Sequence, residues 1–316
     1  MPEGTVNIGT MFGGRNVDTF LGLPRCDDLA RLQPGAAILG APCATPYASV
    51  GPYCADAPRT IRQTSARYAG ALQHMDFDLG GPILASGAIP AVDCGDLPFD
   101  AADAAGNRAR IRDAVGAMLE ADAVPVIVGG DDSIPIPLFE AFAGRGPFTV
   151  VQVDAHIDWR DEVDGERYGL SSTMRRASEM GHVERIVQIG ARGLGSARPA
   201  DYRDALDWGV TFVTARELYE TGVEAALAHV PEGAPVLLAF DCDALDPTTM
   251  PAVIGPAPGG LTYWQAVDIV QGVARRSRIA AFDLVEFMPA RDIHGLGALT
   301  ASRLLVNAIG AIVRQD

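Results

Sequence analysis

The stretch FTVVQVDAHID, residues 148–158, decides the fold. Its first six residues are apolar or β-branched apart from one Gln, and Asp154, His156 and Asp158 follow at once. A nearly continuous run of this kind is typical of a strand covered on both faces. Side chains two residues apart on an extended chain share a face, about 6.6 Å apart. The three polar side chains can therefore point the same way from the end of a buried strand.

Similar apolar runs alternate with amphipathic stretches along most of the chain. The predicted strands are 37–40, 124–128, 148–153, 185–189, 211–213, 236–240 and 280–285, and the predicted helices include 108–121, 134–142, 199–208, 262–275 and 298–314. This alternation predicts right-handed crossovers and a parallel sheet with helices on both faces. Because no Ser/Gly-rich linker interrupts the pattern, one large α/β domain is expected.

Four acidic segments each follow one of these strands. They are GGDDS at 129–133, DAHID at 154–158, DCD at 241–243 with Asp246-Pro247, and Glu286. Ligands of open parallel sheets bind beyond the carboxyl ends of the strands, so these segments should meet at one edge.

Carboxylates brought together in this way repel one another and raise each other's pKa unless a cation lies among them. Carboxylates with one imidazole suit Mn²⁺ or, less typically, Ni²⁺. The ligands suffice for two ions about 3.5–4 Å apart with a bridging hydroxide as nucleophile. The alternative interpretation is that these carboxylates are solvated loop residues. For any single segment it is about as good as a metal site, but it explains three such segments at strand ends poorly.

The composition excludes several classes of protein. The chain has 316 residues with 25 basic and 40 acidic side chains, a net charge of −15, and every basic residue is Arg. Without Lys there is no Schiff-base lysine and no P-loop lysine. The acidic balance also argues against a nucleic-acid partner.

Cysteine usage and hydropathy indicate a cytoplasmic protein without a membrane partner. Five cysteines are widely spaced and form no C-x-x-C pair, namely Cys26, Cys43, Cys54, Cys94 and Cys242. Free thiols in a reducing compartment explain this pattern better than disulfides or zinc. No apolar run reaches about 18 residues, and residues 1–15 lack a basic start followed by an apolar stretch.

Taken together, the motifs resemble the ureohydrolase family of arginase and agmatinase. The matching segments are G-G-D-x-S at 129–133, D-A-H-x-D at 154–158, F-D-x-D-x-x-D-P at 240–247, F-D-L-V-E at 282–286 and Ile61-Arg62. The resemblance covers the chain from about Gly40 onward and implies a three-layer α/β/α fold around an eight-stranded, mainly parallel sheet. It further implies a single domain over 1–316, with 1–35 as an N-terminal extension and a candidate contact between subunits.

The resemblance also implies a centre of two divalent ions, Mn²⁺ or Ni²⁺, that hydrolyses a guanidinium C–N bond. Asp154 and Asp241 would bridge the ions, with Asp158 on one ion and His156 and Asp243 on the other. Glu286 would hold the substrate guanidinium by a charge-assisted pair, and Asp158 and Glu286 are the candidate catalytic residues. The plainer alternative for Glu286 is a carboxylate that caps the next helix.

Two positions depart from the family pattern. Most active members carry His as a metal ligand where this chain has Asp132, whose side chain is shorter and adds a negative charge. The segment that carries another His in arginase and agmatinase reads GLSSTMRR at 169–176 here, with no His.

A branch that includes guanidine hydrolase and metformin hydrolase resembles this chain at DWRDE, 158–162, and PAVI, 251–254. Trp159 could stack on a guanidinium plane or simply pack in the core. Tyr168 and Met174 are expected to line the substrate mouth.

The predicted function is metal-dependent hydrolysis of a small guanidine or biguanide, such as metformin. In one hypothesis the chain is a weakly active subunit of a trimer or hexamer that includes a homologous chain with His at the Asp132 position. In the other it is a self-sufficient homo-oligomeric enzyme with Asp132 as a working ligand. The sequence leans to the first. It leaves open the choice among guanidine, a guanidino acid, agmatine and a biguanide, and between the two metals.

Overall fold

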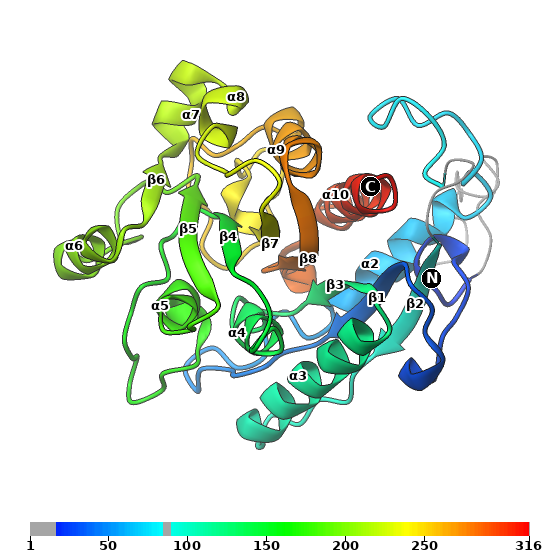
Figure 1. The fold of residues 1–316 in the computed structure, drawn as a ribbon, viewed down its shortest axis with the longest axis horizontal. Helices are drawn as coiled ribbons and strands as arrows, with labels where there is room; N and C mark the ends of the chain where they lie inside the picture. Colours follow the sequence, from blue (N-terminus) through cyan, green and yellow to red (C-terminus); the bar gives the residue numbers. More distant parts are fainter. Residues whose placement is uncertain (1–16, 85–89, 316) are drawn as a thin grey trace.

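The computed structural model describes residues 17–84 and 90–315, and a single sheet runs through the middle of the molecule (Figure 1). Its eight strands are β1 (Ala36–Ala41), β2 (Ala91–Asp96), β3 (Val124–Gly129), β4 (Phe148–Val153), β5 (Val183–Ile189), β6 (Thr211–Val213), β7 (Pro235–Asp241) and β8 (Arg278–Val285). The order is β2-β1-β3-β8-β7-β4-β5-β6, and every pairing is parallel. The predicted α/β class with an eight-stranded parallel sheet is confirmed.

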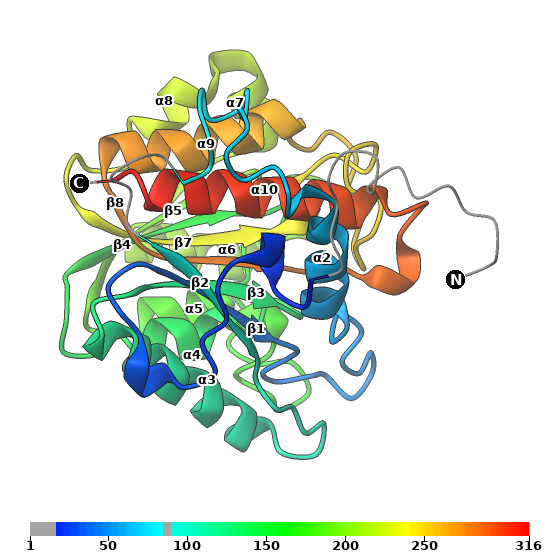
Figure 2. The same ribbon diagram turned by 90° about the vertical axis from the view of Figure 1, so that its right-hand side faces the viewer.

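Helices cover both faces of the sheet, as the edge-on view shows (Figure 2). The α-helices are α2 (Ala57–Ser65), α3 (Ala104–Glu120), α4 (Pro135–Glu140), α5 (Thr173–Ser178), α6 (Pro199–Trp208), α7 (Ala215–Thr221), α8 (Val223–Leu227), α9 (Tyr263–Arg276) and α10 (Leu296–Ile312). Six short 3₁₀ segments join them: η1 (Phe20–Gly22), η2 (Leu29–Arg31), η3 (Ala66–Tyr68), η4 (Leu170–Ser172), η5 (Cys242–Ala244) and η6 (Pro289–Arg291). One layer contains α2, α9 and α10, and the opposite layer contains α3, α4 and α5.

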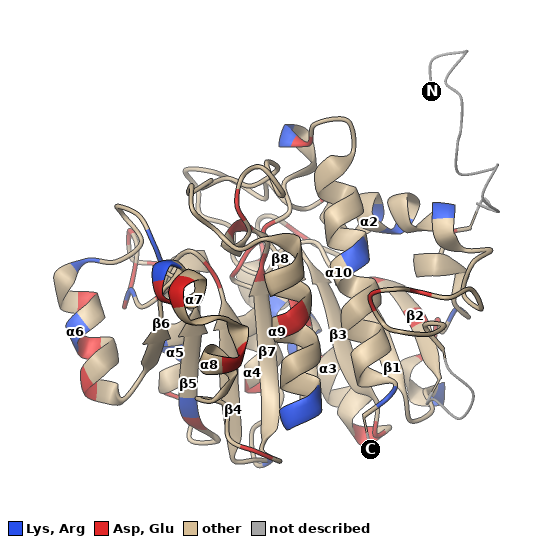
Figure 3. Cartoon of the chain, turned by 90° about the horizontal axis from the view of Figure 1, so that it is seen from above, with Lys and Arg blue, Asp and Glu red and all other residues tan. Residues whose placement is uncertain are grey.

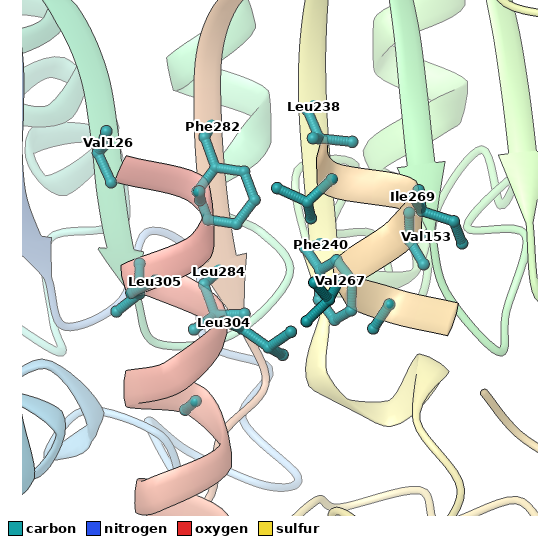
Figure 4. Packing of buried hydrophobic residues seen from close by; sticks show 14 of the residues in the cluster. Val126, Val153, Leu238, Phe240, Val267, Ile269, Phe282, Leu284, Leu304 and Leu305 are labelled. Atoms are coloured by element: carbon teal, nitrogen blue, oxygen red, sulfur yellow. The ribbon is translucent and has the colours of Figure 1, made fainter. Parts of the chain in front are cut away.

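Two hydrophobic clusters hold these layers to the sheet. Successive residues of a strand face opposite sides. Phe282 and Leu284 of β8 therefore belong to the cluster under α9 and α10, whereas Ala281 and Val285 belong to the other. Figure 4 shows the side chains of β8 directed toward Leu304 of α10. Burial of both faces explains why the strands read as continuous apolar runs.

The structure describes the predicted N-terminal extension only from residue 17, and residues 1–16 lie outside the described part. Phe20 and Leu21 are fully buried in the larger cluster, and the backbone N–H of Phe20 donates to Asp93 at 2.6 Å. Arg25 forms a parallel bridge with Asp93 of β2. This part of the extension therefore packs against its own domain, and a contact between subunits remains a prediction.

A buried ion pair ties α2 to the edge of the sheet. Arg62 is 6% exposed and donates to Asp93, which is fully buried, through Nε at 2.7 Å and Nη2 at 3.1 Å. A second pair joins Arg62 to Asp96. Breaking a buried pair leaves an uncompensated charge, which costs several times more than loss of a surface pair.

We therefore expect Arg62→Met to lower the free energy of unfolding by about 3–5 kcal/mol. The matched control is Arg59→Met on the same helix, because Arg59 is largely exposed and its ion pair within the described residues is with exposed Asp56. That change should cost less than about 0.5 kcal/mol. Denaturant titration measures both values, and equal losses in the two variants would contradict the assigned role of Arg62.

None of the helices within residues 17–84 and 90–315 combines the length and apolar character needed to cross a membrane.

Candidate metal centre and substrate pocket

The four acidic segments follow four strands that are neighbours in the sheet, in the order β3-β8-β7-β4. Their carboxyl ends meet at one edge, and Figure 3 shows acidic residues gathered in loops beyond the ends of the central strands. The chain passes from β3 to β4 across β8 and β7, which makes this edge the crevice where ligands of open α/β sheets bind. The predicted convergence is therefore present in the structure.

Two groups of side chains at this edge have the geometry of metal ligands. One consists of Asp154, His156 and Asp243, and the other of Asp132, Asp154 and Asp241. Within each group, one ligand atom per residue lies within 4.8 Å of the others. Asp154 belongs to both groups, as expected of a residue that bridges two ions.

Local backbone hydrogen bonds aim these carboxylates. The N–H of His156 donates to Asp154 Oδ1 at 2.6 Å, and the N–H of Asp243 donates to Asp241 Oδ1 at 2.6 Å. In each motif the carboxylate thus accepts a bond from the residue two positions further on, which is the usual turn made by Asp. The N–H of Ala155 donates to Asp243 Oδ1 at 3.1 Å and joins the β4 and β7 segments.

A buried glutamine on strand β4 donates hydrogen bonds to two of the site's carboxylates. Gln152 of β4 is 1% exposed, and its amide donates to Asp154 Oδ2 and Asp158 Oδ2, both at 2.7 Å. Gln188 of β5, its partner in the ladder, donates in turn to Gln152. Such supporting bonds fix the orientation of ligands before an ion binds. Gln152 was not predicted to take part in the site, because it lies inside an otherwise apolar strand.

Asp158 lines the cavity but is not part of either three-residue group. Its φ is +43°, a strained conformation for a residue with a side chain, and its carbonyl accepts the N–H groups of Met174 and Arg175 at 3.1 Å. Strain of this kind collects at functional sites. A ligand or catalytic role for Asp158 remains a prediction.

The GGDDS segment directs its two aspartates differently. Asp131 accepts the Cys43 thiol at 3.1 Å and the Ser133 hydroxyl at 2.5 Å, so its carboxylate is used within the fold. Asp132 instead joins the ligand group. A side chain at Gly130 would place Cβ 1.9 Å from the carbonyl oxygen of Pro42, so glycine is required for this close approach.

Glu286 follows β8 and is nearly buried, with a φ of +67°. Its Oε1 accepts the hydroxyl of Tyr53 at 2.6 Å and the N–H of Asp132 at 3.0 Å. Its Oε2 is buried and has no hydrogen-bond partner among the described residues. Glu286 therefore offers one free carboxylate oxygen to the cavity. Tyr53 was not predicted, because its contact with Glu286 spans 233 residues of sequence.

The electrostatics of the site favour a cation. Burial, and then the neighbouring carboxylates, raise the pKa values of Asp132, Asp154 and Asp241 well above the usual range. Burial alone would lower the pKa of His156, but its hydrogen bonds to Asp154 and Asp243 raise that pKa to about 12. Without metal the site thus keeps protons that an ion would displace.

The residues present fit two divalent ions. The donors are carboxylates and one imidazole, which is the set that Mn²⁺ and similar ions bind. Asp132 Oδ2 is buried without a hydrogen-bond partner in the described part of the chain, which is costly unless a ligand meets it. Asp154, which both groups share, would be the residue able to contact both ions.

Beside these residues lies a cavity of about 240 Å³. Its lining consists of Asp132, His156, Ile157, Asp158, Trp159, Arg160, Leu170, Ser171, Gly195, Ser196, Asp201, Asp241, Asp243, Ile254, Gly255 and Glu286. Ser171 and Ser196 were not predicted to lie here, since nothing in their spacing marks them, and Arg160 stood out only as part of the DWRDE segment.

The three residues predicted to contact substrate occupy different places. Trp159 reaches the cavity wall from the core: it is 2% exposed, packs edge-on against Trp208 and donates to Asp204 at 2.7 Å. Of the two interpretations of Trp159, stacking on a guanidinium or packing in the core, its position therefore agrees with core packing. Met174 is fully buried at the start of α5, and Tyr168 lies under the guanidinium of Arg108, 4.4 Å away. Neither Tyr168 nor Met174 is among the residues that line this cavity, and a contact of either with the substrate remains a prediction.

Comparison with known proteins gives the class to which this fold and site belong. Residues 34–310 match the model of the arginase family. A mitochondrial agmatinase of Gallus gallus is 32% identical over 279 residues, which cover 85% of this chain and 78% of that protein. A guanidinopropionase of Pseudomonas aeruginosa is 32% identical over 302 residues, covering 92% and 89%. The proclavaminate amidino hydrolase of Streptomyces clavuligerus has the same fold, with a TM-score of 0.80 and 25% identity over 96% of this chain and 99% of that one.

The chain belongs to the arginase family. It is a ureohydrolase, a metal-dependent hydrolase that acts on the C–N bonds of linear amidines.

Proposed function

We propose that this site hydrolyses a small guanidino compound slowly, because Asp132 stands where the family has a neutral ligand. The observation that carries the proposal is the pair of ligand groups joined by Asp154, with the free oxygen of Glu286 beside them. Asp132, Asp154 and Asp241 would hold one ion, with Asp158 as a further ligand, and Asp154, His156, Asp241 and Asp243 the other. Ions of this kind lower the pKa of a water molecule held between them.

The protein's own residues bind and orient the substrate. Glu286 pairs with the guanidinium, since a carboxylate and a guanidinium form short charge-assisted bonds. The bonds that Glu286 accepts from Tyr53 and from the N–H of Asp132 fix its position. Water exclusion by the buried floor strengthens these contacts. The C–N bond that breaks thus lies next to the ion site.

Charge explains why the rate should be low. The carboxylates of Asp132, Asp154, Asp158, Asp241 and Asp243 carry a formal charge of −5 when ionised, against +4 for two divalent ions. With a neutral ligand in place of Asp132 the sum would be zero. Additional negative charge reduces the acidity of a water molecule near the ions. One pKa unit corresponds to about 1.4 kcal/mol.

We therefore expect Asp132→His to raise both metal occupancy and turnover, the latter by about tenfold or more. The test incubates the wild-type and variant proteins with Mn²⁺ or Ni²⁺. Metal content is then measured by mass spectrometry. Turnover is measured as the release of urea or an amine from guanidine, a guanidino acid, agmatine and metformin. The wild type should turn over at less than about 1 s⁻¹, the low end of ordinary enzymes. A wild-type rate well above that would show that Asp132 is a fully working ligand.

The same charge favours a second arrangement, in which this chain supports an active homologous subunit in a trimer or hexamer. The proposed partner is a homologous chain with His at the Asp132 position. The resemblance to the branch of guanidine hydrolase and metformin hydrolase is consistent with this proposal. Co-purification of the two chains with activity above that of either alone would support it. Separate homo-oligomers after co-expression would refute it.

A further inference from the structure

We infer that Arg160 binds a carboxylate on the substrate, so that the compound hydrolysed is a small guanidino acid. The inference rests on the proposed function, because it assigns the second end of a substrate whose guanidinium lies at Glu286. Arg160 lines the same cavity as Glu286. Among the cavity residues it contributes the one guanidinium, while the floor is made of carboxylates.

The charge of Arg160 is not used within the described part of the fold. None of the carboxylates in residues 17–84 and 90–315 lies within 4.0 Å of its guanidinium, which also donates no hydrogen bond there. Its neighbour Asp161 pairs instead with Arg167 at 3.2 Å and with Arg176 at 2.7 Å. Glu179 likewise pairs with other arginines. The acids nearest in sequence are therefore already engaged.

The backbone holds Arg160 in place at the cavity. Its N–H donates to the carbonyl of Ser171 at 3.0 Å, which joins the segment after β4 to η4. Two residues earlier, the carbonyl of Asp158 accepts two N–H groups from the start of α5. Both ends of this short turn are thus fixed against the site. A side chain that leaves a fixed turn loses less freedom when it binds a ligand.

Other polar groups on the cavity wall do not offset this charge. Asp201 lines the cavity, but Arg198 holds its two oxygens at 2.7 and 3.1 Å. Ser171 and Ser196 carry neutral hydroxyls, and that of Ser196 donates to the carbonyl of Arg192 at 2.7 Å. The cavity therefore presents an anionic floor and a cationic wall.

A compound with a cation at one end and an anion at the other matches this polarity. A guanidino acid places its guanidinium at Glu286 and its carboxylate at Arg160, whose planar guanidinium can form two parallel bonds to it. Agmatine carries an ammonium at the second end, which Arg160 would repel. Guanidine has no second end, and the second end of metformin carries no anion. Among the open substrate classes, the cavity thus favours the guanidino acids.

The test compares ligands that differ only in the carboxylate. Isothermal titration of the Mn²⁺-loaded protein is carried out with 4-guanidinobutanoate and with butylguanidine, and again with agmatine. We expect the wild type to bind the acid roughly 10- to 100-fold more tightly than butylguanidine. Arg160→Gln should remove that difference and leave the affinity for butylguanidine unchanged. The control Arg167→Gln, which changes a paired arginine outside the cavity, should keep the preference.

Each outcome decides between the claims. Equal wild-type affinity for the acid and for butylguanidine would overturn the role of Arg160 and leave guanidinium binding at Glu286 intact. A preference that persists in Arg160→Gln would place the carboxylate elsewhere and overturn the inference as well. Failure of the wild type to bind any of the compounds would contradict the proposed function together with the inference.

Discussion

Replacing Asp154 by Asn is expected to remove both metal ions from the protein. Asp154 belongs to both ligand groups, so the change withdraws an anionic ligand from each ion at once. An amide is a weaker, neutral ligand for a hard divalent ion. The bound metal should therefore fall from as many as two ions per chain to none that survives gel filtration.

The fold should survive this substitution. Asn keeps the size of Asp, and burial together with repulsion from Asp158 already raises the pKa of Asp154 in the metal-free protein. The matched control is Asp161→Asn, because Asp161 is an exposed carboxylate outside both ligand groups. Elemental analysis of both variants, with circular dichroism to verify folding, makes the comparison. Undiminished metal in folded Asp154→Asn would show that the ligands are assigned wrongly.

Glu286→Gln is expected to leave the metal content unchanged and to weaken guanidinium binding by about 100-fold or more. The carboxylate is nearly buried, and loss of one partner of a buried charge pair costs several kcal/mol. Tyr53→Phe provides the graded comparison, because it removes the phenol donor but keeps the negative charge. Its effect should be smaller. Titration with butylguanidine measures all three proteins.

The pH dependence of guanidinium binding provides a second test of Glu286→Gln. In the metal-free protein, burial and then the charge of Asp131 raise the pKa of Glu286 to about 8. Below that pH the carboxyl is mostly neutral and cannot pair with a cation, so guanidinium affinity should rise as the pH increases from about 7 to 9. Glu286→Gln should show no such rise. A wild-type affinity independent of pH would mean that Glu286 does not bind the guanidinium.

Most strands of the sheet could be predicted from the hydrophobic pattern. Strand β2 was not predicted, and its omission has a physical explanation. β2 has the sequence AVDCGD, whose alternate residues are only partly buried because it is an edge strand. Asp and Gly are also poor strand formers, so no apolar run marks it. Helix α2 was missed as well: its sequence APRTIRQTS is mostly polar, and it is held by buried Arg62 instead of a broad apolar stripe. In both cases tertiary contacts outweigh local pattern.

The candidate site divides in the same way. The gathering of the aspartates and His156 at one edge of the sheet could be predicted because each motif is local and follows a strand that the sequence marks clearly. Tyr53 and Gln152 were not predicted, and neither was the place of Arg160 in the cavity, since these depend on contacts between segments distant in sequence or on the shape of the cavity. Met174 and Tyr168 lie in the segment predicted to form the mouth, but Met174 is fully buried and Tyr168 packs under Arg108, which the sequence pattern does not reveal.

The most direct test of the two-ion centre is anomalous X-ray diffraction, at the manganese absorption edge, from crystals of the Mn²⁺-loaded protein. We predict a strong peak among Asp154, His156 and Asp243, and a second, less fully occupied peak among Asp132, Asp154 and Asp241. Crystals of metal-saturated protein with no peak at either position would contradict the account.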